Sequence, residues 1–290
     1  MGCADVVPGV SGGTIAFICG IYERLLNGIK SFDITTLRLV LKGDFAGVWA
    51  RVPFVFFISL GLGLVAAIVS LAKVLSHLMT EHPVSLWSFF FGLVLGSIIL
   101  LGRQTWRWKP VDWVVFAAFA FGTFTLVGLS VLKTPPGLTF TFIAGAIAIC
   151  AMILPGISGS YLLVIMGKYQ VVLNAVNDRD FVTLGVFCLG IVTGILSFVR
   201  VVSWLLRHYR HTTLIALTGV MAGALRTLWP WKETLTTRIN SHGEVVPVAQ
   251  ANIMPGMESN LVMAVGLAIA GGLAVMLIER LAKAEPASEA

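Results

Sequence analysis

The chain has 290 residues, of which 57% are hydrophobic and 12% are charged, and its mean hydropathy is +0.92. This composition excludes a soluble globular domain and predicts an integral membrane protein of several helices. The net charge of +6 is attributed to cytoplasmic loops, where Lys and Arg accumulate, and not to nucleic-acid binding.

The chain opens on a Pro-Gly-x-Ser-Gly motif at residues 8–12. Proline cannot continue a preceding helix, and glycine permits a sharp turn. Serine is a favoured N-cap, so we expect a helix that begins at Ser11 and runs to about Gly28. Its apolar part, Ile15–Ile21, is far shorter than the roughly 20 residues that cross a bilayer. The motif therefore predicts a half-helix that enters the membrane without spanning it.

Residues 31–52 are polar and mixed, with a short interfacial helix expected at Ile34–Leu41. Three full spans are predicted after this segment, each a long apolar stretch. Their ranges are Pro53–Ser76, Val84–Gly102 and Val111–Leu132. Residues 133–137, which contain two consecutive prolines, mark a break between two halves of the chain.

The second half follows the same order. The apolar segment Leu138–Leu154 enters the membrane and ends at a second copy of the motif, at residues 155–159. Ser158 is expected to cap a second half-helix that runs to about Ala175. Three more spans are predicted, and the stretch Lys232–Glu258 between the last two is expected to be a polar loop. These spans are Phe181–Leu206, Thr212–Leu225 and Ser259–Ile278.

Two ungapped matches relate the halves. Residues 7–27 match residues 154–174 at a shift of 147, and residues 53–98 match residues 180–225 at a shift of 127. We therefore predict an all-α polytopic membrane protein made of two repeats. The first repeat is residues 1–134 and the second is residues 135–290, each with one motif and three spans. Counted from Val7, the first motif has only six residues before it, so either the first half lacks the apolar lead-in of the second motif or its N-terminus is missing or misassigned.

The number of spans fixes the relative orientation of the repeats. Because three is odd, the second repeat must be inverted with respect to the first. The two motifs then form re-entrant loops that enter from opposite sides and meet near the midplane, as in many secondary transporters. Placing residues 31–52 and 103–110 in the cytoplasm puts most of the basic residues on that side, as the positive-inside rule requires.

The paired motifs predict a site for an anion. Broken helices with free N–H groups inside a membrane are a common way to hold one. Glycine lets a headgroup approach the backbone closely, and the Ser and Thr hydroxyls can donate to phosphate oxygens. A plain helix kink needs neither the repetition nor so many glycines. The candidate binding residues are Pro8, Gly9, Ser11, Gly12, Gly13, Thr14, Pro155, Gly156, Ser158, Gly159 and Ser160.

Five charged residues are further candidates for substrate binding. Lys73 and Arg200 occupy equivalent positions inside spans, and each either serves the site or snorkels to the interface. Asp5 is either a proton-coupling carboxylate or a helix cap. Glu23 and Arg24 form either an interfacial ion pair or a ligand pair.

The cysteines and the glycines inside the spans say less about function than the motifs do. The cysteines lie singly and form no Cys-x-x-Cys or Cys/His cluster, so we expect no disulfide, metal or other cofactor. The span glycines permit close helix packing within or between protomers, which leaves a homo-oligomer open. The cysteines are Cys3, Cys19, Cys150 and Cys188, and the glycines include Gly61, Gly63, Gly190 and Gly194.

The strings 4–17 and 20–24, together with the second motif, closely resemble the bacterial and archaeal membrane family labelled domain of unknown function 368. Its members are described as translocases that return undecaprenyl phosphate, the lipid carrier of cell-wall synthesis, to the cytoplasmic leaflet. The resemblance implies a flippase, not an enzyme, in the cytoplasmic membrane of a prokaryote. Its partner is then a polyprenyl phosphate lipid, with proton or sodium coupling left open.

Two other functions compete with this interpretation. The undecaprenyl pyrophosphate phosphatase family is loosely similar, but it carries Pro-Gly-x-Ser-Arg-Ser and intramembrane glutamates. Here Gly12 and Gly159 replace that arginine, and the spans contain neither paired Glu nor a His nucleophile. A transporter of a small soluble anion also fits the predicted site.

Overall fold

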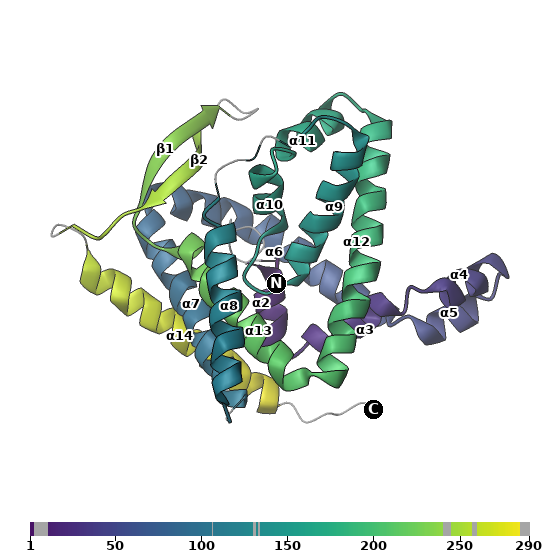
Figure 1. Ribbon diagram of the computed structural model, residues 1–290, viewed down its shortest axis with the longest axis horizontal. Helices are drawn as coiled ribbons and strands as arrows, with labels where there is room; N and C mark the ends of the chain where they lie inside the picture. Colours follow the sequence, from purple (N-terminus) through teal and green to yellow (C-terminus); the bar gives the residue numbers. More distant parts are fainter. Residues whose placement is uncertain are drawn as a thin grey trace.

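The structure, a computed structural model, describes residues 1–2, 11–105, 107–129, 132, 134–239, 245–256 and 260–284. Helices dominate it, and a two-stranded hairpin lies at one end (Figure 1). In the first half the helices are α2 (Gly12–Ile18), α3 (Tyr22–Lys30), α4 (Ile34–Leu41), α5 (Phe45–Arg51), α6 (Phe54–Glu81), α7 (Pro83–Gln104) and α8 (Pro110–Leu126).

The second half contains helices, one 3-10 turn and the hairpin. Its elements are α9 (Leu138–Ile153), α10 (Gly159–Ile165), α11 (Tyr169–Asn177), α12 (Phe181–His208), α13 (Arg210–Ala224), η1 (Leu225–Leu228), β1 (Lys232–Ile239), β2 (Val245–Asn252) and α14 (Leu261–Ala284). The α12–α13 turn and the start of α8 lie toward one end of the molecule, and α11 and the hairpin lie toward the other (Figure 1).

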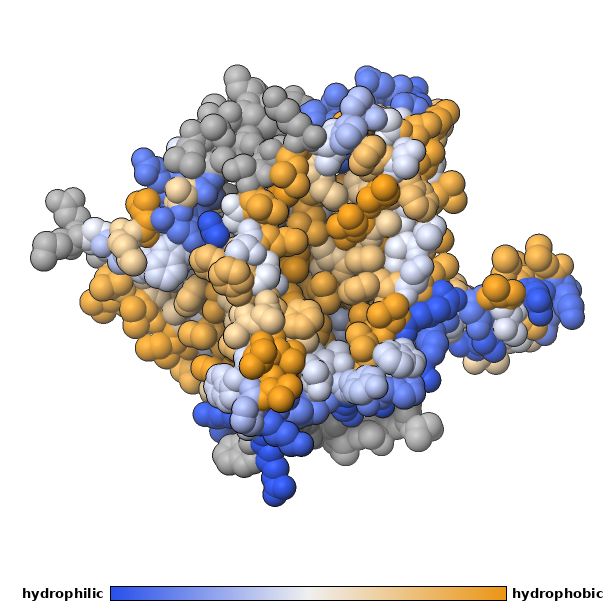
Figure 2. All heavy atoms as spheres, in the orientation of Figure 1, coloured by the Kyte–Doolittle hydropathy of each residue, from blue (hydrophilic) through white to orange (hydrophobic). Residues whose placement is uncertain are grey.

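The helices agree with the predicted multi-pass helical membrane protein, although the β-hairpin departs from the predicted all-α fold. Among the described residues, four helices (α6, α7, α12 and α14) have the length and apolar composition to cross a bilayer. Helix α8, at 17 residues, is shorter than the span predicted there, whereas α13, at 15 residues, is about as long as its predicted span, Thr212–Leu225. Figure 2 shows apolar side chains across the middle of one face, with hydrophilic ones toward its upper and lower ends.

Helix α8 ends early because its C-terminal backbone turns toward the second motif. The prediction extended this span to Leu132, but the helix stops at Leu126. The Val127 carbonyl accepts a hydrogen bond from the Tyr161 hydroxyl at 2.7 Å. Beyond it, the Leu132 N–H donates to the Ile165 carbonyl at 2.6 Å. Bonds to α10 thus replace the next turn of α8.

The predicted polar loop at Lys232–Glu258 is wrong for most of its length. Strands β1 and β2 pair antiparallel from Lys232 opposite Asn252 to Ile239 opposite Val245. Threonine and valine are frequent in these two stretches, and both residue types favour strands. The overall polarity of the segment concealed this pattern.

The two predicted half-helices are each broken once more. Helix α2 ends before Gly20, whose φ is +70°, and α10 ends before Gly167, whose φ is +65°. A left-handed glycine is a common helix terminator because it needs no Cβ in a strained conformation. The continuous helices expected to reach Gly28 and Ala175 are therefore pairs of short helices.

Element bounds recur between the halves at the shifts found in the sequence. Helices α6 and α12 both have 28 residues and start at residues 54 and 181, which are 127 apart. Helices α2 and α10 both have 7 residues and start at residues 12 and 159, which are 147 apart. The same shift relates α3 to α11, each of 9 residues.

The halves interleave through two matching helix crossings. Helix α8 packs against α13, and α14 packs against α7, so the last span of each half lies on the other half. Gly219 of α13 approaches the Phe116 carbonyl so closely that a Cβ would lie 2.6 Å from its oxygen. Its sequence match, Gly92 of α7, makes the same approach to the Ala268 carbonyl of α14. These glycines let the backbones meet at both crossings.

Candidate functional site

The first motif begins α2 as predicted. Ser11 has an extended backbone, and its Oγ accepts a hydrogen bond from the Gly13 N–H at 3.1 Å. Gly12, Gly13 and Thr14 follow in the first turn of the helix and are buried. The predicted site residues Asp5, Pro8 and Gly9 lie outside the described residues.

The first motif contacts the residues that lead into the second. The Ser11 hydroxyl donates to the Leu154 carbonyl at 3.3 Å, directly before Pro155. A Cβ on Gly13 would lie 2.9 Å from the Ile153 carbonyl oxygen, closer than a side chain tolerates. Glycine at this position therefore permits the contact, and the structure brings together two stretches more than 140 residues apart.

Thr14 leaves a polar group without a partner inside this contact. The residue is 0% exposed, and its Oγ1 has no hydrogen-bond partner among the residues that the structure describes. A buried hydroxyl without a partner costs free energy, so such groups in native proteins commonly serve a ligand or a water molecule. A role for the Thr14 hydroxyl in substrate binding stays a prediction.

The second motif is held against α9 and α13. Gly156 adopts a φ of +95°, and a Cβ there would lie 3.1 Å from both the Ala224 Cβ and the Met221 Cα. Gly159 packs directly on the Ala148 carbonyl of α9. Both positions require glycine, the first for its conformation and the second for its space.

The hydroxyls of the second motif are more accessible than those of the first. Ser158 occupies the N-cap position of α10 but makes no side-chain capping bond, contrary to expectation. Its Oγ lies 2.9 Å from the Oγ of Ser160, which is exposed, while Pro155 beside them is buried. The serine pair is therefore available to an incoming ligand.

The structure places the two basic candidates from the spans on the outer surface. Lys73 is exposed on α6. Arg200 is exposed on α12, and its guanidinium donates to the Leu196 carbonyl of the same helix at 2.7 Å. These positions fit the snorkelling alternative, and a role for either residue at the site stays a prediction.

Glu23 and Arg24 do not form the ion pair that was one alternative. Glu23 of α3 pairs with Arg210 at the start of α13, at 3.0 Å. The Arg24 guanidinium instead lies over the ring of Phe56 of α6, 4.9 Å from its centre. Residues one apart on a helix point in different directions, so their side chains meet different neighbours.

Two basic residues that the sequence did not single out lie around α10, the helix that begins at the second motif. The Arg226 guanidinium donates to the Phe124 carbonyl at 3.0 Å, packs over Gly128 and interacts electrostatically with Tyr161. Lys168 is 3% exposed, and its Nζ donates to the Pro135 carbonyl at 2.8 Å. The sequence could have pointed to Lys168 only by its position next to Gly167. That the residue is buried is revealed only by the tertiary structure.

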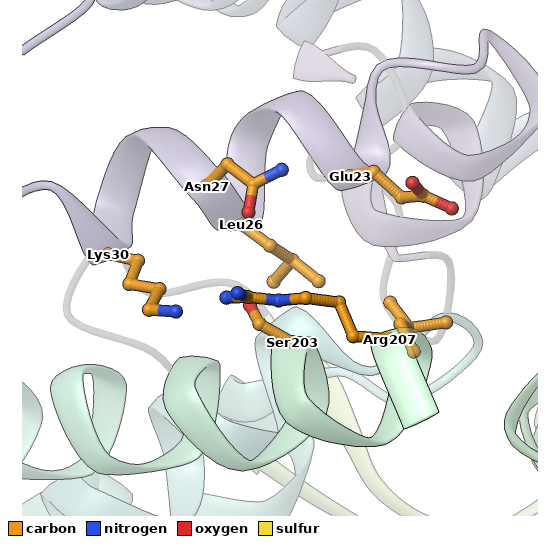
Figure 3. A pocket seen from close by; sticks show the side chains of 7 residues that line it. Glu23, Leu26, Asn27, Lys30, Ser203 and Arg207 are labelled. Carbon is orange, nitrogen blue, oxygen red and sulfur yellow. The ribbon is translucent and has the colours of Figure 1, made fainter. Parts of the chain in front are cut away.

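A cavity of about 360 Å³ lies between α3 and α12 (Figure 3). Glu23 and Lys30 line it from α3, and Ser203 and Arg207 line it from α12. Of these residues only Glu23 was predicted to bind substrate. The others escaped notice because the contact between α3 and α12 joins the two halves of the chain and leaves no local sequence pattern.

Comparisons with known proteins point to one family. A family model described as undecaprenyl phosphate translocase-like matches residues 1–246. The chain is 48% identical over 258 residues to a Vibrio cholerae protein named polyprenyl-phosphate transporter, with 88% of this chain and 83% of that protein covered. It is 28% identical over 251 residues to a Staphylococcus aureus protein of the same name, with coverage of 79% and 83%. No solved structure matches the chain.

Proposed function

Because the chain belongs to the undecaprenyl phosphate translocase-like family, we propose that it moves undecaprenyl phosphate between the leaflets of a bacterial cytoplasmic membrane. In this proposal the lipid returns to the cytoplasmic leaflet for reuse in cell-wall synthesis. The protein binds and carries the phosphate without chemical change, and the two Pro-Gly-x-Ser-Gly motifs hold the headgroup.

The contact between the first motif and the lead-in to the second carries the proposal. The Ser11 hydroxyl reaches the Leu154 carbonyl at 3.3 Å, and the buried Thr14 hydroxyl beside it has no partner among the described residues. Transfer of a phosphate through a bilayer is prohibitively costly unless its charge and oxygens are met on the way. Hydroxyls and close-packed glycines where the first motif contacts the lead-in to the second supply such a path.

The second motif supplies the first contact for the headgroup in this proposal. Ser158 and Ser160 present adjacent hydroxyls 2.9 Å apart, and the Arg226 guanidinium lies near Tyr161, the next residue. Helices α2 and α10 have only seven residues each, so their dipoles contribute little. Hydroxyl donors and Arg226 therefore provide most of the stabilisation of the phosphate.

The recurrence of helix bounds supports a mechanism of alternating access. Two inverted repeats can exchange conformations, so that inward-open and outward-open states have similar energies. The equal lengths of α6 and α12 and the matching crossings at Gly92 and Gly219 are what such a design requires. In this proposal the two motifs form re-entrant loops on opposite sides of the site.

The test measures exchange of labelled undecaprenyl phosphate between the leaflets of proteoliposomes, with released phosphate assayed in the same samples. The parent is expected to exchange the lipid without releasing phosphate. The double variant Ser158→Ala/Ser160→Ala and the variant Arg226→Gln are expected to be slower. Arg38→Gln, on the exposed side of α4, is the matched control.

Each outcome of this test discriminates between functions. Released phosphate would indicate a phosphatase. Folded protein that exchanges no lipid, but carries inorganic phosphate across the vesicle membrane, would indicate a transporter of a small anion. Unchanged exchange in both motif variants would refute the role given to the second motif.

A further inference from the structure

The cavity between α3 and α12 has an unbalanced positive charge. Glu23 is neutralised by Arg210 at 3.0 Å. Lys30 and Arg207 also line the cavity, and neither has an acidic partner within the parts of the chain that the structure describes. Figure 3 shows Lys30 reaching from α3 toward α12, where Arg207 lies beside Ser203. Two cations face one space between the helices.

Ser203 adds a buried hydrogen-bond donor to the same cavity. The residue is 4% exposed, and its Oγ is without a hydrogen-bond partner among the described residues. Leu26 and Leu206, both buried, complete the inner wall. Arg207 is exposed and Lys30 is half-buried, so water reaches both cations, and the buried Ser203 hydroxyl beside them can donate to an anion bound in the cavity.

We propose that this cavity binds a phosphate group, with Lys30 and Arg207 meeting its charge and Ser203 donating a hydrogen bond. A phosphate monoester carries about −1.5 to −2 charges at neutral pH, which matches two cations. The cavity volume of about 360 Å³ lies in the range of pockets that hold small ligands. The headgroup of a polyprenyl phosphate and free inorganic phosphate share this chemistry.

The position of the cavity suggests a subsite separate from the motifs. It lies toward the end of the molecule that contains the α12–α13 turn (Figure 1), the end predicted to face the cytoplasm. Helix α3 continues from the first motif, whereas α12 belongs to the second half, so a bound phosphate bridges the halves. The idea that the subsite receives or releases the lipid headgroup rests on the proposed function. The inference that the cavity binds phosphate does not depend on that function.

The test compares binding of three probes to the protein in nanodiscs: undecaprenyl phosphate, undecaprenol and inorganic phosphate. We expect the parent to bind undecaprenyl phosphate more tightly than undecaprenol. Lys30→Gln and Arg207→Gln should each weaken that binding about tenfold or more, because each removes a charge-assisted hydrogen bond. Lys42→Gln, an exposed basic residue after α4, is the matched control and should bind like the parent.

A charge swap separates loss of binding from loss of folding. Lys30→Glu would face Arg207 across the cavity and form an ion pair, so the fold should keep its thermal stability while phosphate binding is lost. Parent-like binding of both phosphates by the Lys30→Glu and Arg207→Gln proteins would overturn the inference. Inorganic phosphate that binds as tightly as the lipid, with the same sensitivity to the variants, would support the site and identify free phosphate as its ligand.

The same variants keep this inference distinct from the proposed function. Parent protein that exchanges lipid between leaflets, beside cavity variants that bind and exchange like the parent, would refute the cavity alone. Parent protein that binds phosphate in the cavity without exchanging lipid would refute the translocase and leave the cavity standing.

Discussion

Gly13 tests the contact between the first motif and the lead-in to the second most directly. In Gly13→Ala the new Cβ would lie 2.9 Å from the Ile153 carbonyl oxygen, 3.1 Å from the Ser11 Oγ and 3.3 Å from the Met152 carbonyl oxygen. Ordinary contact begins at 3.4 Å, so α2 must withdraw by about 0.5 Å. Two of these neighbours are backbone atoms and cannot rotate away. We expect a loss of about 1–3 kcal/mol in the free energy of unfolding, as for other overpacked sites.

The assay pairs thermal unfolding in detergent with lipid exchange in proteoliposomes. The control is Gly61→Ala on α6, where a Cβ meets nothing within 4 Å and alanine favours the helix by about 1 kcal/mol. Gly13→Ala should unfold at a lower temperature than the parent and exchange lipid more slowly, and Gly61→Ala should do neither. If Gly13→Ala matched the parent in both measurements, the motifs would not need this contact and the reasoning would fail.

Three further substitutions probe other parts of the fold. Gly219→Val, at the α8–α13 crossing, should lower the free energy of unfolding by about 1–3 kcal/mol. The control is Gly122→Val, because a Cβ at Gly122 meets nothing within 4 Å. Thermal unfolding of the two proteins measures the difference. At Asp33, a backbone N–H at the start of α4 and the Arg51 guanidinium lower the pKa. The stability that the ionised Asp33 carboxylate contributes is therefore fully present above pH ~3.9 and is lost as pH falls through the lower pKa of the folded state. The protection of the α4 amides against hydrogen exchange should fall in acid, and Asp33→Asn should abolish that fall. Burial lowers the pKa of Lys232 to about 8, against ~10.4 unfolded. The unfolded state then binds more protons between these values, so stability should increase with pH across that window, and Lys232→Met should remove the increase.

The sequence predicted the long helices well because hydropathy and duplication acted together. An apolar stretch long enough to span is a strong signal on its own. The predicted helix at Ile34–Leu41 agrees with α4. Predicted and observed bounds differ by five residues at the end of α6, where the helix continues to Glu81. Helix α8 was predicted too long because no local pattern reveals that the backbone after Leu126 forms hydrogen bonds with α10.

Contacts between the halves account for the parts of the site that were missed. Lys30 and Arg207 are 177 positions apart (207 − 30), and nothing near either residue indicates that they share a cavity. Glu23 was selected with Arg24, its neighbour in sequence, although its partner is Arg210. Motifs and periodicity report local structure, whereas a binding site made by two helices from different halves depends on how those helices pack.

The two motifs match in sequence but differ in their surroundings, which gives the proposed mechanism a structural test. Thr14 is 0% exposed, whereas Ser160 is exposed. If alternating access operates, this structure is one of two states, and the other state exposes the first motif and covers the second. In protein whose cysteines are replaced by alanine, a thiol reagent should label Ser160→Cys quickly and Thr14→Cys slowly. Undecaprenyl phosphate should make the two rates more alike, because transport populates both states. Rates that do not respond to the lipid, in protein that still exchanges it, would show that transport proceeds without exposing the first motif, and alternating access between the motifs would be refuted.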